Sequence, residues 1–278
     1  MKEQEKRSCG HDLSLPTATG REHKIGIFQP TRRPELINTE ITTKWGKIRI
    51  KARLGQQHAD VFEAICHEFE ARTPLECEME DGRIKLLVDP AKIKRKSRQK
   101  DLKNILTDLR AAVIEIIEPP NLQCMGGLID YIDFARKPDG SYITKRNPLG
   151  GERRMWRVDL GKAFCKLIQK DIWINYDPKP IAELRHGITQ AAVRFILSHS
   201  RNSGPKINKW KIDTVITAVS GDISSQELRD RRREILKDKE NLNNMGIKIE
   251  NGYIFTTNKK ESVEHLVDIK GGRGAFGR

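Results

Sequence analysis

Two helices separated by a tight turn are predicted between residues 213 and 242, and this segment constrains the fold more than any other. Asp213 can cap the first helix, over 214–219, and Gly221 can end it because glycine adopts positive φ freely. Ser224 and Glu227 form a capping box, which begins a longer helix. Its predicted buried face carries Leu228, Ile235 and Leu242.

A β-hairpin is predicted directly behind these helices. Residues 247–250 and 253–255 are joined by Asn251–Gly252, the strongest short-range signal for a two-residue hairpin turn. A further helix precedes the pair, since Leu184, Ile188, Ala191 and Phe195 share one helical face. This order of helix, helix, turn, longer helix and hairpin is typical of a winged helix, in which the longer helix enters the major groove of DNA.

The first half of the chain predicts a less regular version of the same arrangement. A helical stripe runs from Gln56 to Ala71, with Glu63, Glu68 and Glu70 outside it. Alternating residues on both sides of Asp81–Gly82 predict a hairpin over 75–88.

Two more helices and two strands are predicted after this hairpin. Asp89–Pro90 begins one helix, and Ser97 can cap the next. The buried stripe of the second helix comprises Leu102, Ile105, Leu106 and Leu109. Strand-like runs follow over 113–117 and 128–134.

Proline and glycine clusters set the predicted domain boundaries. Residues 1–40 have no hydrophobic period, which predicts a flexible N-terminal arm, and residues 258–278 predict a flexible tail. Asp177–Pro180 is a stiff break, so we expect a first winged-helix domain over 41–178 and a second over 181–257. The expected fold class is therefore α+β, with two tandem winged-helix domains. The turns at 139–140, 147–148 and 150–151 predict a connector.

Charge favours a polyanionic partner. The 278 residues carry 52 Lys+Arg against 38 Asp+Glu, a formal net charge of +14. Residues 41–180 contribute +7 and residues 181–278 contribute +6, so both expected domains are basic. No apolar run approaches the ~20 residues that a membrane-spanning helix needs, and the N-terminus has no apolar signal-peptide region. We expect a cytoplasmic protein that does not contact membranes.

The longer helix of the second domain supplies the candidate residues for reading bases. Arginine and glutamine make bidentate contacts with guanine and adenine edges, whereas lysine suits phosphates. The candidates for DNA contact in this domain are Gln226, Arg229, Arg232, Arg233, Lys237 and Lys248. The alternative interpretation is an ordinary solvated helix, since Glu234, Asp238 and Glu240 can pair with these bases.

A dense basic cluster in the first domain supplies candidates for backbone contacts. Seven Lys and Arg lie between Lys92 and Lys103, against Asp101 alone. We expect phosphate contacts here, with a steep dependence of affinity on salt. A nuclear-localisation tract is the competing interpretation. The candidates for DNA contact are Lys94, Arg95, Lys96, Arg98, Lys100, Lys103 and Asn104.

Three stretches resemble plasmid replication initiators of the tandem winged-helix type, including the TrfA-like group. They are GGLIDYIDFARK, RMWRVDLGKAFCKLI and SSQELRDRRREILKDKENLNNMGIKIENGYIF, and the resemblance covers about residues 40–257. It implies binding to repeated double-stranded DNA sites at an origin, opening of adjacent AT-rich DNA, and recruitment of the host initiator and replicative helicase. It also implies homodimerisation through the first domain and repression of the protein's own gene.

The residues expected of an enzyme are missing from the sequence. The seven histidines include no His-x-His pair for a nickase metal, and there is no GxxxxGK[ST] loop for nucleotide phosphates. Asp130 and Asp133 should lie on opposite faces of a strand, and Ser198–His199 should end a helix. The five cysteines contain no CxxC pair. We therefore expect a non-enzymatic protein without cofactor or metal.

The alternative function is a winged-helix transcriptional repressor without an origin role.

Overall fold

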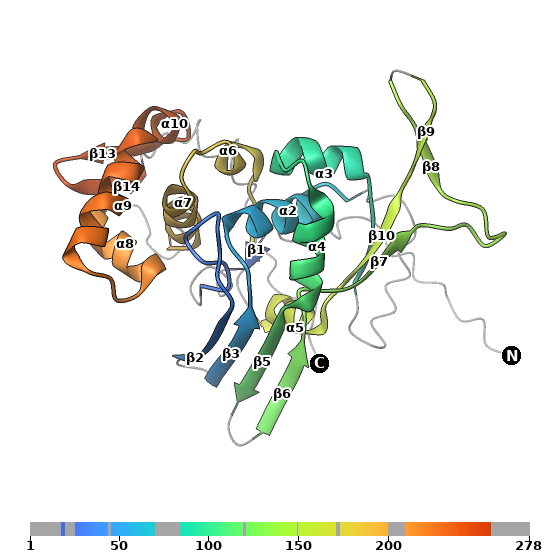
Figure 1. The fold of residues 1–278 in the computed structure, drawn as a ribbon, viewed down its shortest axis with the longest axis horizontal. Coiled ribbons are helices and arrows are strands. Elements are labelled where there is room, and N and C mark those ends of the chain that lie inside the picture. Colours follow the sequence, from blue (N-terminus) through green and yellow to red (C-terminus); the bar gives the residue numbers. More distant parts are fainter. Residues whose placement is uncertain are drawn as a thin grey trace, which may run out of the picture.

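Two hydrophobic cores divide the molecule into two lobes (Figure 1). The computed structural model describes residues 18–19, 26–43, 46–69, 84–118, 121–148, 150–170, 173–199 and 209–256. The first lobe comprises the elements around the core whose residues run from Ile27 to Leu167. The second lobe surrounds the core built from Ala18 and from residues between Ile174 and Ile254.

Three helices and a three-stranded sheet form the centre of the first lobe. The helices are α2 (Gln56–His67), α3 (Pro90–Ser97) and α4 (Leu102–Ala111), with α3 and α4 packed against α2. The strands are β4 (Lys85–Val88), β7 (Ile129–Phe134) and β10 (Trp156–Leu160). Strand β10 lies between the other two and is antiparallel to both.

The first lobe carries three further structures around this centre. A four-stranded sheet has the order β2 (Ile37–Thr43), β3 (Gly46–Ala52), β5 (Val113–Glu118) and β6 (Asn121–Gly126). Helix α5 (Lys162–Lys170) packs against strands β5, β6 and β7. The connection between β7 and β10 is a long hairpin, residues 135–155, that includes β8 (Thr144–Arg146) and β9 (Glu152–Arg154).

The second lobe is built mainly from the C-terminal part of the chain. Its helices are α6 (Lys179–Ala182), α7 (Gly187–His199), α8 (Ile212–Ser220), α9 (Ser225–Lys237) and α10 (Lys239–Asn244). A sheet has the order β12 (Lys209–Lys211), β14 (Tyr253–Thr256) and β13 (Ile247–Glu250). Strand β1 (Ala18–Thr19) pairs with β11 (Trp173–Ile174).

The two lobes repeat one topology. In the first lobe α2, β4, α3, α4, β7 and β10 follow one another, and in the second lobe the corresponding elements are α7, β12, α8, α9, β13 and β14. In both sheets the last strand lies between the first and the second. The first lobe differs by having β5 and β6 inserted after its third helix and a longer hairpin before its last strand.

Most predicted helix ends and turns are confirmed. Asp89 caps α3 by accepting a hydrogen bond from the Ala91 N–H at 2.9 Å. Ser224 and Glu227 make the reciprocal bonds of a capping box. Asn251 and Gly252 both have positive φ, at 51° and 76°, as a tight hairpin turn between right-handed twisted strands requires. The buried stripe from Leu102 to Leu109 is also as predicted.

Three predicted helix features are wrong. Ser97 bonds back to the Ile93 carbonyl within α3, and Asp101 caps α4 instead. Asp213 lies in the first turn of α8 and caps nothing, because its carboxylate binds Arg232. Leu242 lies on α10, since the long helix ends at Lys237 and the chain turns at Asp238.

The predicted boundaries also need correction. Residues 26–40 are no flexible arm: Ile27 and Phe28 lie in the first core, and β2 begins at Ile37. Two backbone hydrogen bonds fix this loop, from Gln29 N–H to the Leu54 carbonyl and from Gln56 N–H to the Thr31 carbonyl. The predicted connector at 139–151 is the long hairpin of the first lobe. The described residues do not include 1–17, 70–83 and 257–278. The predicted tail over 258–278 and most of the hairpin predicted over 75–88 therefore lie outside them.

Candidate nucleic-acid interface

The outer face of α9 is polar and held in one network. Arg229 donates to the Gln226 side-chain oxygen at 2.8 Å, and Gln226 donates to Asp230 at 3.0 Å. Arg233 completes the row through Asp230, at 3.1 Å. All four side chains are exposed, so the bonds hold the long side chains in an ordered row without burying them. Contacts of this kind contribute little to stability and can be exchanged for contacts with a ligand.

Arg232 has a different position from its neighbours on α9. Its guanidinium binds the Asp213 carboxylate through two nitrogens and so braces α9 against α8. The predicted DNA contact of Arg232 would have to replace this ion pair, in which both side chains remain partly exposed. Lys237 and Lys248 are exposed, and their side chains have no hydrogen-bond or ion-pair partner among the described residues.

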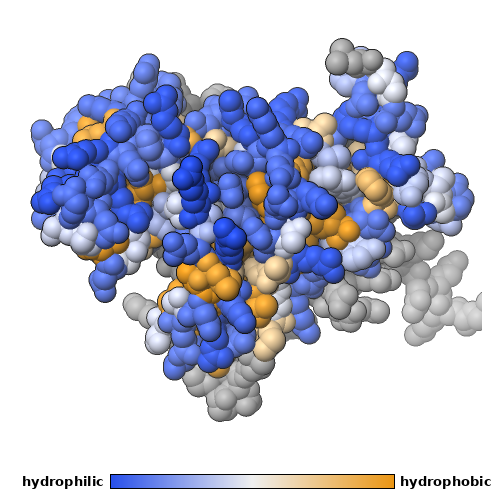
Figure 2. All heavy atoms as spheres, viewed as in Figure 1, coloured by the Kyte–Doolittle hydropathy of each residue, from blue (hydrophilic) through white to orange (hydrophobic). Residues whose placement is uncertain are grey.

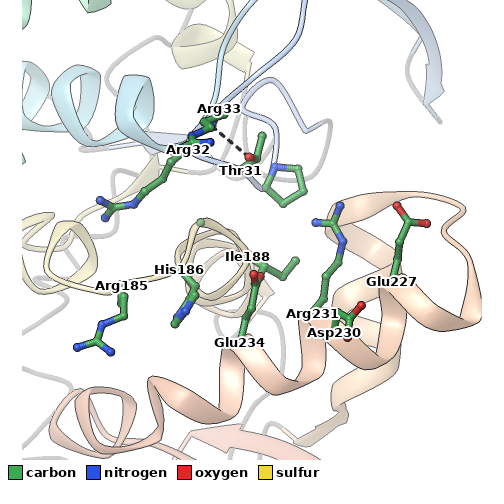
Figure 3. Close-up of a pocket in the computed structure, with 12 residues that line it drawn as sticks. Thr31, Arg32, Arg33, Arg185, His186, Ile188, Glu227, Asp230, Arg231 and Glu234 are labelled. Carbon is green, nitrogen blue, oxygen red and sulfur yellow. Dashed lines mark hydrogen bonds between the residues drawn. The ribbon is translucent and has the colours of Figure 1, made fainter.

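The opposite flank of α9 borders a cleft in which charges of both signs alternate (Figure 3). From α9, Glu227, Asp230, Arg231 and Glu234 line this cleft, whose other side carries arginines of the loop at 30–33 and Arg185, just before α7. Asp238, at the end of α9, accepts from the backbone N–H groups of Arg185 and His186, both at 3.1 Å. Glu227 and Glu234 thus lie on the flank that borders the cleft, together with Arg231, whereas Asp230 also belongs to the polar row on the outer face.

A basic surface covers α3 and the turn into α4. Lys94, Arg95, Lys100 and Lys103 are exposed, and among the described residues their side chains have no hydrogen-bond or ion-pair partner. Asn104 donates to Asp101 at 2.8 Å, which turns its amide towards the N-terminus of α4. This surface lies at the top of the view in Figures 1 and 2, where hydrophilic residues predominate.

Two of the predicted phosphate-binding residues are engaged in ion pairs. Lys96 is only 15% exposed and binds Asp177 at 2.8 Å and Glu68 at 3.2 Å. It therefore joins α3 to the segment that enters the second lobe, which corrects its predicted role as a DNA contact. Arg98 remains largely exposed and approaches Glu183 at 3.3 Å.

The long hairpin is a basic surface that we did not predict. Arg154 lies over the Tyr142 ring at 4.1 Å and over the Phe134 ring at 5.2 Å, and Arg136 lies over Tyr142 at 4.5 Å. Arg153 binds the buried Asp89 carboxylate with two nitrogens. The sequence signal was the density of basic residues over 136–154, which we interpreted as part of a connector.

A buried ionic network joins the two lobes. Arg194 of α7 is 2% exposed and donates to Glu63 at 2.6 Å and to Asp60 at 2.9 Å, both on α2. Tyr176 donates to Glu63 at 2.6 Å and Gln56 accepts from Arg194 at 2.6 Å. Burial raises the pKa of both carboxyls, and the two carboxyls raise the pKa of Arg194. Glu63, predicted to be solvent-facing, instead faces the second lobe.

Within the described residues, no group of three or more His, Cys, Asp or Glu could hold a metal ion. Ser198 and His199 lie at the C-terminal end of α7, where both contact the Phe195 carbonyl. In the same part of the chain, no helix combines the length and the apolar character needed to cross a membrane.

Comparison with known proteins identifies the fold. No family model and no curated protein sequence matches the chain. Two crystal structures are similar to this chain. One is of RctB domains 2–3, with a TM-score of 0.51, and the other is of a selenomethionine form of the same domains, with a TM-score of 0.50. Each is 11% identical and covers 88% of this chain, and the matches cover 99% and 98% of the RctB fragments. The chain therefore has the fold of domains 2–3 of RctB.

Proposed function

We propose that this protein is a replication initiator that binds double-stranded DNA through two winged helices, one in each lobe. The observation that carries the proposal is the topology repeated in the two lobes. In each lobe, a helix with exposed basic residues precedes two antiparallel strands, and the hairpin between these strands would form the wing. The fold shared with RctB domains 2–3 supports an initiator over other proteins with two such units.

In this proposal, α9 and α4 are the helices that enter major grooves. Arg229, Arg233 and Gln226 of α9 have the donor and acceptor groups that discriminate purines. Lys103 and Asn104 lie near the start of α4, the end at which recognition helices commonly contact bases. The two hairpins, 135–155 and 247–256, would then contact the flanking backbone.

The origin-specific activities rest on the resemblance to TrfA-like plasmid initiators. We propose that binding to directly repeated sites brings the protein to a plasmid origin, where it promotes opening of AT-rich DNA. Because the sequence has no nucleotide-binding loop, ATP-driven unwinding would come from a recruited host initiator and helicase.

Footprinting of the DNA that flanks the gene tests the proposal. One molecule reading two successive major grooves, ~34 Å apart, should protect about two helical turns of an asymmetric repeat. A plasmid carrying this DNA should be maintained only when the protein is supplied in trans. Arg229→Ala with Arg233→Ala should abolish specific protection, whereas Lys51→Gln, on the four-stranded sheet, should not.

The symmetry of the protected DNA decides the result. A symmetric dimer that uses one winged helix per subunit would require an inverted repeat. Protection of a single palindrome over a promoter, without plasmid maintenance, would contradict the initiator and identify a transcriptional repressor.

A further inference from the structure

A shallow basic concavity lies where the C-terminal end of α3 meets α6. Among the described residues, five cations and the Gln99 side chain line it, without a carboxylate: Lys94, Arg95, Arg98, Lys100 and Lys179. Like charges gathered this closely repel one another, so the arrangement favours an anionic ligand that contacts several of them at once.

Both lobes contribute to this concavity. Four of the cations follow one another along α3 and the turn after it, whereas Lys179 begins α6 of the second lobe. Two ion pairs cross the junction beside it, Lys96 with Asp177 at 2.8 Å and Arg98 with Glu183 at 3.3 Å. Helices α3 and α6 are in direct contact, and they lie side by side in Figure 1.

The cations exceed the acids available to them. The Glu183 carboxylate lies 3.3 Å from the Arg98 guanidinium and 3.9 Å from the Lys179 ammonium group, and it is itself 41% exposed. Lys94, Arg95 and Lys100 have no partner among the described residues. Protein contacts therefore leave most of this positive charge uncompensated.

Buried contacts between the lobes fix the position of Lys179 relative to the cations of α3. Behind the junction, Arg194 ties α7 to α2 through two carboxylates that are fully buried. Because α3 packs on α2 and α6 packs on α7, this network holds the two walls of the concavity together. A ligand would meet an arrangement that is already formed, which lowers the entropy lost on binding.

We propose that the concavity binds the phosphodiester backbone of the DNA segment between the two half-sites read by α4 and α9. The inference rests on the proposed function and extends it, because the same stretch of backbone would be held from both lobes. Binding of one lobe would then position the DNA for the other. A single helix that contacts phosphates would provide no such coupling.

Salt dependence of binding tests the site directly. The probe is a fluorescent duplex containing one repeat protected in the footprint, and the variants are Lys94→Gln, Arg95→Gln and Lys179→Gln. Loss of one phosphate contact should reduce the slope of log K against log salt by about 0.9, so that raising salt fourfold weakens each variant about 3.5-fold less than the wild type. Lys51→Gln, on β3 and outside the lining of the concavity, should leave the slope unchanged.

A second probe isolates the coupling between lobes. On a duplex that keeps only the half-site of the first lobe, Lys179→Gln should behave as Lys51→Gln does, whereas Lys94→Gln should still reduce the slope. Neutral methylphosphonates placed between the half-sites should mimic Lys179→Gln, and combining the two should add nothing. Circular dichroism melting confirms that each variant is folded.

The outcomes separate this inference from the proposed function. If Lys179→Gln matches Lys51→Gln on the complete repeat while Arg229→Ala with Arg233→Ala loses specific binding, the junction site is wrong and DNA binding stands. If the wild-type protein binds no duplex, both proposals are overturned.

Discussion

At the scale of single residues, His58 joins the start of α2 to the side of α4. Its Nδ1 accepts the Gly55 N–H at 3.0 Å, so the proton must lie on Nε2, which donates to Asp108 at 3.1 Å. Burial lowers the pKa of His58, against a weaker opposing effect from Asp108. The neutral ring is therefore the form that the folded protein needs.

We expect acid to destabilise the protein through this residue. Because the folded pKa of His58 lies below its unfolded value, the stabilisation is fully present above about pH 6.5 and is lost as pH falls towards the folded pKa. The free energy of unfolding should fall by at most about 1.4 kcal/mol per pH unit in this window. Urea denaturation of the wild type and of His58→Gln, from pH 8 to pH 5, measures the effect.

The control uses the capping role of residue 58. Glutamine at this position can still accept the Gly55 N–H, as in a capping box, but does not titrate. The difference in free energy of unfolding between the two proteins should therefore shrink as pH falls. A difference that stays constant from pH 8 to pH 5 would show that His58 binds the same number of protons in the folded and unfolded states.

Glu63 shows what a single-residue pattern could not predict. Helical spacing correctly identified Val61, Phe62 and Ile65 as buried, because that stripe packs against the core of its own lobe. Glu63 lies on another side of α2, which is covered by α7, a helix about 130 residues later in the chain. A charged residue is normally exposed, and only knowledge of Arg194 opposite it would have reversed that expectation.

At the scale of elements, Asp89 couples the long hairpin to the start of α3. The same carboxylate caps α3 and binds Arg153 of β9 with two bonds, and Lys145 of β8 lies 3.9 Å away. Burial alone would raise the pKa of Asp89, but the bonds from Arg153 and Ala91 hold it below its usual value. Asp89 therefore fixes the direction of the hairpin relative to the helices.

Asp89→Asn should separate these two roles. Asparagine caps helices about as well as aspartate, so α3 should persist, but the charge partner of Arg153 is lost. We expect the protein to lose about 2 kcal/mol of stability and the hairpin to exchange its amide hydrogens faster. Hydrogen exchange over 135–155 and over α3 measures both. Unchanged exchange in the hairpin would mean that the aromatic and arginine contacts at its base suffice.

Elements with strong local signals were predicted well, and the others were not. The capping box of α9 and the Asn251–Gly252 turn depend on neighbouring residues, so their positions followed from the sequence. The long hairpin depends on pairing between β7 and β10, across about 20 residues of irregular composition. Its turns were recognised, but the sequence alone did not show which strands they connect.

At the scale of the whole molecule, the two lobes form one unit through Arg194. The Asp177–Pro180 break predicts two separate domains, and each lobe does have its own core. The contact between α2 and α7 is nevertheless buried and charged, with one guanidinium between two carboxyls. If this contact sets the distance between α4 and α9, it would also set the spacing of the two half-sites in the proposed mode of DNA binding.

Arg194→Met should therefore uncouple the lobes. Removing one partner of a buried ion pair costs about 3–5 kcal/mol, because the remaining charges stay desolvated. Calorimetry should show one unfolding transition for the wild type and two for the variant, with Arg233→Met, on the exposed face of α9, as the matched control. With no guanidinium beside them, Asp60 and Glu63 should bind protons on folding, so the variant should be most stable in mild acid and lose stability as pH rises towards 7. A variant that keeps a single transition, without this pH dependence, would show that packing alone holds the lobes together.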